Sequence, residues 1–280
     1  MLVLGAAREQ YRSAQRLSLL GLTALRRARG SSPPERLAAL LAVFQLAVVR
    51  NVTDHTAGML EEQGIRDAPV ASLAAGALVG VASDGRDLGS LLTLPDLTAA
   101  QFDRIVATQL QDVSRQAASI ERAVRPQVTH YVRALNLPSC GRCVVLAGKP
   151  ERSDVAFRRH PRCDCLAVPS NAANAGRLAT DPVEAFDAMT AAERAKAFTQ
   201  AGAEAISLGA NIGRVVNARS GMGTAQVFGR DVKTTSALRR RYGSGPRGDE
   251  VRLMPESIAQ IATDRDDHLR LLRLYGYITD

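Results

Sequence analysis

All four cysteines of this 280-residue chain lie between Cys140 and Cys165, together with His160, one of its four histidines. Cys140 and Cys143 form a Cys-x-x-Cys pair, and the second group, His-Pro-Arg-Cys-Asp-Cys, begins at His160. A Cys-x-x-Cys turn brings two thiolates to one ion, and a second short group completes the tetrahedron that zinc prefers. The spacing therefore predicts a structural Zn²⁺ site with candidate ligands Cys140, Cys143, His160, Cys163 and Cys165.

These five side chains compete for four positions around the ion, so one of them is spare. On a strand Cys163 and Cys165 would face opposite sides, which favours Cys140, Cys143, His160 and one of these two. Four cysteine ligands are the rival set. Disulfides would require a secreted protein, and a redox Cys-x-x-Cys needs a following helix, of which the residues after Cys143 give little sign. Both alternatives stay open.

The sequence predicts no catalytic residue. Ser139 and the nearby His130 are the best candidate pair for nucleophilic catalysis, but no serine lies in a nucleophile elbow. The residues around Lys149 lack the glycine and hydroxyl positions of a P-loop. A structural zinc ion fixes a loop and supplies no reaction by itself, so we expect a structural protein and not an enzyme.

The charge balance of the chain is basic, with 36 Lys and Arg residues against 28 Asp and Glu residues and a net charge of +8. Nearly all the basic residues are arginines, whose guanidinium forks suit phosphate and carboxylate groups. A solvated helix face, a flexible surface segment and the codon bias of a GC-rich genome are the alternatives to nucleic-acid binding. The predicted nucleic-acid contacts are Arg8, Arg12, Arg16, Arg239, Arg240 and Arg241.

Hydrophobic periodicity predicts a mainly α protein in which an N-terminal helical bundle occupies residues 1–127. Long helices are expected over residues 1–29, 33–59 and 99–124, with capping boxes beginning at Ser32 and Thr98. The most apolar run, residues 37–49, is too short to cross a bilayer, so we predict no membrane span.

Residues 128–280 are predicted to form a small α+β zinc-stabilised module followed by C-terminal helices. Short strands at residues 144–147 and 166–169 would flank the second Cys/His group. Further expected elements are a helical region over 182–206 with a capping box at Thr190, a helix over 209–219, a loop or extended arm over 220–250 and a closing helix from 254.

The segments around the cysteines also resemble a known family. Residues 137–148 (LPSCGRCVVLAG) and 157–165 (FRRHPRCDC) are similar to the Mu F-like minor head proteins of tailed phages, particularly those of actinobacteriophages. Residues 198–203 (FTQAGA), 216–219 (VNAR) and 271–277 (LLRLYGY) resemble that branch too. The resemblance covers roughly residues 128–280, and its Cys/His pattern is specific only in combination.

The resemblance implies a minor capsid, or head morphogenesis, protein that assembles in the host cytoplasm and becomes part of the virion. It would lie inside the capsid at the portal vertex, in several copies around the portal, and aid head assembly and DNA packaging or ejection. The implied partners are the portal protein, the major capsid protein and packaged double-stranded DNA. Some relatives are labelled capsid maturation proteases, so cleavage of scaffold or coat protein is the alternative function.

Overall fold

A computed structural model describes residues 4–158, 163, 165–227, 229–236 and 252–279. It confirms the mainly helical class, with 59% helix, 11% strand and two small three-stranded sheets in the described part of the chain. The chain forms two compact units, the first comprising Met1–Asn136 and Lys149–Ala179 and the second Leu137–Gly148 and Thr180–Asp280. The predicted domain boundary after residue 127 is not decided by this division and stays a prediction.

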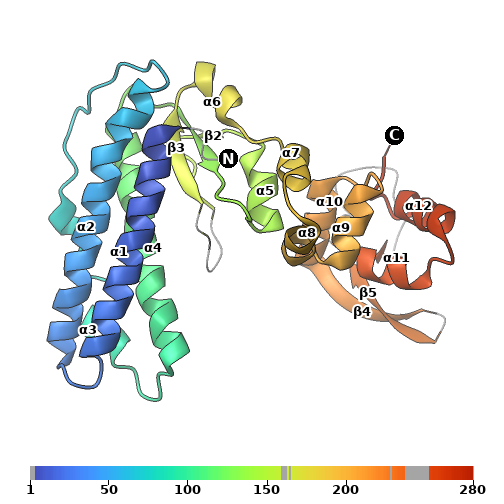
Figure 1. The fold of residues 1–280 in the computed structure, drawn as a ribbon, viewed down its shortest axis with the longest axis horizontal. Helices are drawn as coiled ribbons and strands as arrows, with labels where there is room; N and C mark the ends of the chain where they lie inside the picture. Colours follow the sequence, from blue (N-terminus) through green and yellow to red (C-terminus); the bar gives the residue numbers. More distant parts are fainter. Residues whose placement is uncertain (1–3, 159–162, 164, 228, 237–251, 280) are drawn as a thin grey trace. The chain divides into compact units, whose positions relative to one another are not determined.

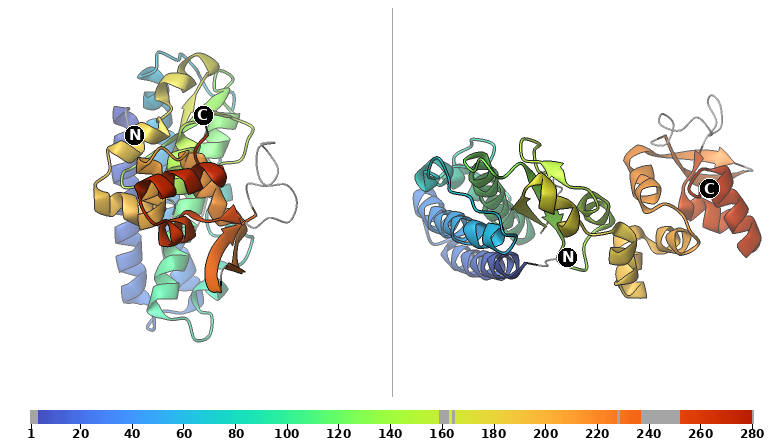
Figure 2. Two further views of the ribbon diagram at one scale, coloured as in Figure 1. Left: turned by 90° about the vertical axis from the view of Figure 1, so that its right-hand side faces the viewer. Right: turned by 90° about the horizontal axis from the view of Figure 1, so that it is seen from above.

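The first unit is built on three long helices that lie side by side (Figures 1 and 2). Their buried faces share one core, which includes Leu25, Leu41 and Phe102, each fully buried. The elements of this unit are α1 (Gly5–Ala28), α2 (Pro34–Glu61), the short 3-10 helix η1 (Ala75–Leu78), α3 (Leu88–Leu92), α4 (Ala99–Ala123), β1 (His130–Ala134), β2 (Glu151–Arg152), β3 (Leu166–Ser170) and α6 (Ala172–Leu178).

Local capping explains where two of these helices begin. The predicted capping box of α4 is confirmed, since Thr98 accepts the Gln101 N–H and the Gln101 side chain accepts the Thr98 N–H. The one predicted at Ser32 is wrong, because α2 begins at Pro34 and no side chain caps it. Pro33 precedes a second proline and is therefore held in an extended conformation, so the helix begins one residue later, with proline at its first position.

Helix α2 is long and apolar enough to cross a membrane. The mean hydropathy of its most apolar 18-residue window is 1.5, and 39% of that window is buried inside the protein. The core helix of a water-soluble protein meets the same criterion, so length and composition do not decide the matter. The predicted absence of a membrane span stays a prediction.

The sheet of the first unit has the order β2-β1-β3, and both pairings of β1 are antiparallel. Tyr131 lies opposite Pro169 and Val132 opposite Val168. Strand β3 confirms the strand expected over residues 166–169, and it follows directly on Cys165. The sheet therefore fixes the chain immediately after the second cysteine pair.

The second unit combines short helices with a hairpin that the sequence did not predict. Strands β4 and β5 pair antiparallel, with Thr224 opposite Lys233, in a region expected to be a loop or extended arm. The helix expected across residue 199 is broken there, since Thr199 has φ 68°. The elements are α5 (Gly141–Ala147), α7 (Pro182–Asp187), α8 (Ala191–Phe198), α9 (Gln200–Ser207), α10 (Ile212–Ala218), η2 (Arg219–Gly221), β4 (Met222–Val227), β5 (Arg230–Thr235), β6 (Arg252–Leu253), α11 (Pro255–Ile261) and α12 (Arg265–Leu274).

Candidate metal centre

Cys140 and Cys143 lie at the start of helix α5, in the second unit. Cys140 caps this helix, because its Sγ accepts the backbone N–H of Cys143 at 3.4 Å. Cys143 is buried, with 2% of its surface exposed, whereas Cys140 is half-buried. An N–H group directed at sulfur favours the charged thiolate, which is the form that binds a metal or acts as a nucleophile.

The strand expected over residues 144–147 is wrong, because these residues belong to α5. The β-branched Val144 and Val145 favour a strand locally. Packing decides otherwise, since Cys143, Val144 and Ala147 are all buried on one side of a helical turn. The helix is also the setting in which redox Cys-x-x-Cys pairs occur, so redox chemistry remains an alternative to metal binding.

Gly141 allows α5 to pack closely on α8. A Cβ atom added to Gly141 would lie 2.8 Å from ring carbons of Phe198 and 3.0 Å from the carbonyl oxygen of Ala197. Phe198 is itself buried and packs edge-on against Phe186, with 5.4 Å between ring centroids. This close approach fixes the helix start that carries the first cysteine pair.

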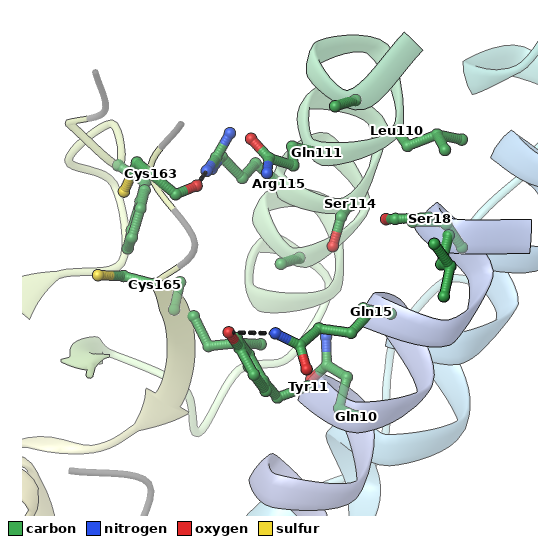
Figure 3. Close-up of a pocket in the computed structure, with 18 of the residues that line it drawn as sticks. Gln10, Tyr11, Gln15, Ser18, Leu110, Gln111, Ser114, Arg115, Cys163 and Cys165 are labelled. Atoms are coloured by element: carbon green, nitrogen blue, oxygen red, sulfur yellow. Dashed lines mark hydrogen bonds between the residues drawn. The ribbon is translucent and has the colours of Figure 1, made fainter. Parts of the chain in front are cut away.

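Cys163 and Cys165 lie in the first unit, just before β3. They are 1% and 6% exposed. Figure 3 shows both sulfur atoms on the same side of the chain, turned away from α1 and α4. Both residues precede the strand, so the alternation that would have left one of them facing away does not apply. Which of the two binds a metal stays a prediction.

Of the five predicted ligands, four are described and three of those are buried. Cys143, Cys163 and Cys165 are the buried thiols that could hold a metal ion, and thiolates are the usual ligands of structural zinc. None of the four cysteines, all of which are described, forms a disulfide. His160 lies outside the described residues, so its part in the site stays a prediction.

Two arginines that sequence reasoning missed contact Cys163. Arg133 on β1 donates from Nη1 to Cys163 Sγ at 3.6 Å, and Arg115 on α4 donates from Nη2 to the Cys163 carbonyl oxygen. Arg133 is 4% exposed. Each lies at least 30 positions before Cys163 in the sequence, so no local pattern signalled the contacts.

A cavity of about 400 Å³ lies beside this second cysteine pair, between α1, α4 and the residues before β3 (Figure 3). Its walls are mostly apolar, and Ser18 of α1 and Ser114 of α4 are among the polar residues that line it. Near one end the Tyr11 hydroxyl accepts hydrogen bonds from Gln15 at 2.7 Å and Asn136 at 2.8 Å. Cys163 and Cys165 are among the residues that line the cavity, but their sulfur atoms are turned away from it (Figure 3).

The predicted nucleic-acid contacts are described only in part. Arg8, Arg12 and Arg16 lie on the exposed face of α1. Glu9 lies 4.0 Å from Arg12 and 3.0 Å from Arg16, so part of their charge is neutralised. Arg239, Arg240 and Arg241 lie outside the described residues. Contact with nucleic acid stays a prediction.

The candidate catalytic pair, Ser139 and His130, is divided between the two units. Ser139 is buried in the second unit, while His130 begins β1 in the first, with its Nδ1 3.0 Å from the Thr129 hydroxyl. Its neighbour Tyr131 packs under the Arg122 guanidinium at 4.5 Å. Burial raises the pKa of Tyr131 and lowers that of Arg122. A tyrosine whose pKa is raised above its ordinary value near 10 stays protonated near pH 7.

Comparison of the chain with protein-family models, with curated proteins and with solved structures finds no significant match.

Proposed function

We propose that this chain is a minor head protein of a tailed phage whose central segment is braced by a structural Zn²⁺ ion. The similarity of residues 137–148 and 157–165 to Mu F-like proteins supports the phage assignment. The single observation that carries the metal site is the burial of Cys143, Cys163 and Cys165, three of the five predicted ligands.

The donor set fits zinc in chemistry as well as in number. Zinc with three or four thiolates carries a net negative charge, which is costly to bury without a compensating cation. Arg133 places a buried guanidinium 3.6 Å from Cys163 Sγ. When bound, the ion would supply a cross-link between Cys140, Cys143 and the later ligands and would perform no chemistry on a substrate.

In this proposal the protein lies inside the capsid at the portal vertex. The long helices of the first unit would bind the portal or major capsid protein, because they are the longest helices in the part of the chain that the structure describes. The exposed arginines of α1 would face packaged DNA or a neighbouring subunit, since forked guanidinium groups suit phosphate and carboxylate.

Metal analysis with single substitutions tests the zinc site. Purified protein should contain one equivalent of zinc, and changing each of the five candidate ligands to serine or alanine should release it in four cases and spare it in one. His55→Ala is a matched control, because the His55 ring lies on α2 and contacts the Asn51 carbonyl at 2.8 Å. Carefully prepared wild-type protein without metal, or with its cysteines joined in disulfides, would contradict the site.

Coexpression with the portal protein tests the place of action. The chain should copurify with portal assemblies and be present in purified heads. Binding to DNA that falls steeply with salt, without any association with portal, would instead support a free nucleic-acid-binding zinc protein.

The alternative enzyme function is a capsid maturation protease. Coexpression with coat or scaffold protein should leave both substrates intact if the proposal is right. Specific cleavage that disappears with His130→Ala or Ser139→Ala, in variants that still fold, would reject a purely structural role.

A further inference from the structure

The guanidinium group of Arg133 contacts three described residues near the second cysteine pair, namely Phe157, Arg158 and Cys163. Arg133 lies over the Phe157 ring, with its central carbon 3.9 Å from the ring centroid. The same side chain donates to the carbonyl oxygen of Arg158 and to Cys163 Sγ. A planar fork with several fixed donors can make such contacts at once, whereas a lysine ammonium cannot reproduce the geometry.

A second arginine holds the same segment from the helical side. Arg115 on α4 donates to the Cys163 carbonyl oxygen, as the dashed line in Figure 3 shows. Its guanidinium also lies 3.4 Å from Asp112, whose other oxygen accepts the Ser83 hydroxyl at 2.8 Å. Because Asp112 is 4% exposed, the anchor belongs to the interior of the first unit.

These contacts are made to the backbone and sulfur atoms of the chain that carries the predicted ligands. Two main-chain carbonyls, of Arg158 and Cys163, are each bound by a guanidinium. Such bonds restrict the backbone at Arg158 and at Cys163 before any ion is present. Groups in this position around a metal site orient the ligands and tune their charge, and their loss typically weakens binding about 10–100-fold.

We propose that Arg133 and Arg115 are positioning residues that hold the Cys163 segment ready for the metal ion. Arg133 also offsets the negative charge of the Cys163 thiolate. This inference rests on the proposed zinc site. It assigns the preorganisation of the later cysteine ligands, Cys163 and Cys165, to two arginine side chains of the first unit.

Co²⁺ titration of the full chain tests the inference, because thiolate-to-cobalt absorption bands report ligation directly and zinc competition then gives the affinity. Arg133→Lys and Arg115→Lys should each weaken binding about 10–100-fold while the shape of the cobalt spectrum is kept. Arg152→Lys is the control, since Arg152 lies on the same sheet but is exposed and pairs with Asp154 at 2.9 Å. Its affinity should equal that of the wild type.

Hydrogen exchange of the metal-free variants separates positioning from general stability. The inference predicts that the three long helices keep wild-type protection while metal affinity falls. Wild-type affinity in both lysine variants, or a loss of affinity in Arg115→Lys that accompanies unfolding of these helices, overturns it. If Arg133→Lys does not fold, Arg115→Gln and Arg115→Ala decide the question. Metal affinity should fall from the wild type to Arg115→Gln and further to Arg115→Ala. Equal affinity in all three proteins would contradict the inference. Failure of the wild type to bind cobalt would refute the zinc site itself.

Discussion

The substitution Gly141→Ala tests whether α5, with the first cysteine pair, packs as closely on α8 as the structure shows. The added Cβ would lie 2.8 Å from two ring carbons of Phe198, below any ordinary van der Waals contact. The ring cannot move freely, because it is 2% exposed and packs edge-on against Phe186. The third close atom is the backbone oxygen of Ala197, which can move only if the end of α8 moves.

Overpacking of this kind costs about 1–3 kcal/mol of unfolding free energy. With a denaturant slope of about 2 kcal/mol per molar urea, a loss of about 2 kcal/mol lowers the unfolding midpoint by about 1 M. Urea titration followed by circular dichroism measures the midpoint, and hydrogen exchange assigns the loss to residues 137–148 and 191–198. The same variant should bind Co²⁺ more weakly, because the start of α5 is displaced.

The matched control is Gly176→Ala on α6, where a Cβ would meet no atom within 4 Å. Alanine is favoured over glycine in a helix, so this variant should be neutral or more stable by about 0.4–1 kcal/mol. If Gly141→Ala were as stable as the control, the close approach of α5 to Phe198 would be refuted.

Three further predictions follow from the core, a helix cap and an ion pair. Leu41→Ala on α2, which empties a fully buried position, should cost about 2–5 kcal/mol in urea unfolding, whereas Val43→Ala at a position 62% exposed should change stability by less than about 0.5 kcal/mol. Thr190→Ala removes the cap of α8 and should cost about 1 kcal/mol, seen as faster hydrogen exchange in its first turn. The hydrogen bond from Arg26 lowers the pKa of Asp103 below its ordinary value near 4. The contribution of this hydrogen bond to the stability of the folded state is therefore present above pH 4 and is lost as pH falls through the lowered pKa. Asp103→Asn should abolish that part of the acid dependence of unfolding. An Asp103 carboxylate that titrates normally by NMR would contradict this.

Local signals in the sequence were sufficient for the long helices. Apolar residues at helical spacing predicted α2 and α4, and arginines that repeat at a spacing of four predicted α1. The box of Thr98 and Gln101 marked the start of α4 to the residue. The box of Thr190 and Glu193 did the same for α8. These features depend on residues three or four positions apart, and such interactions are set by the helix itself.

The short elements were determined by contacts between residues far apart in the sequence, which no local pattern reveals. The valines after Cys143 favoured a strand, but burial of one face produced α5. Thr199 takes a positive φ between α8 and α9, where its hydroxyl donates to Glu256 at 3.0 Å and accepts the Gly202 N–H. The residues around Thr199 contain no turn signal. Glu256, whose carboxylate accepts the Thr199 hydroxyl, lies on α11, far away in the sequence.

The candidate metal site shows the same division. The types and spacing of Cys140, Cys143, His160, Cys163 and Cys165 predicted a metal site from the sequence alone, because these candidate ligands lie close together along the chain. Only the tertiary structure showed that Cys163 and Cys165 turn their sulfur atoms to one side and that Arg115 and Arg133 contact Cys163. Those arginines come from a helix and a strand far away in the sequence, and they meet the cysteine segment only because the helices and the sheet of the first unit pack together.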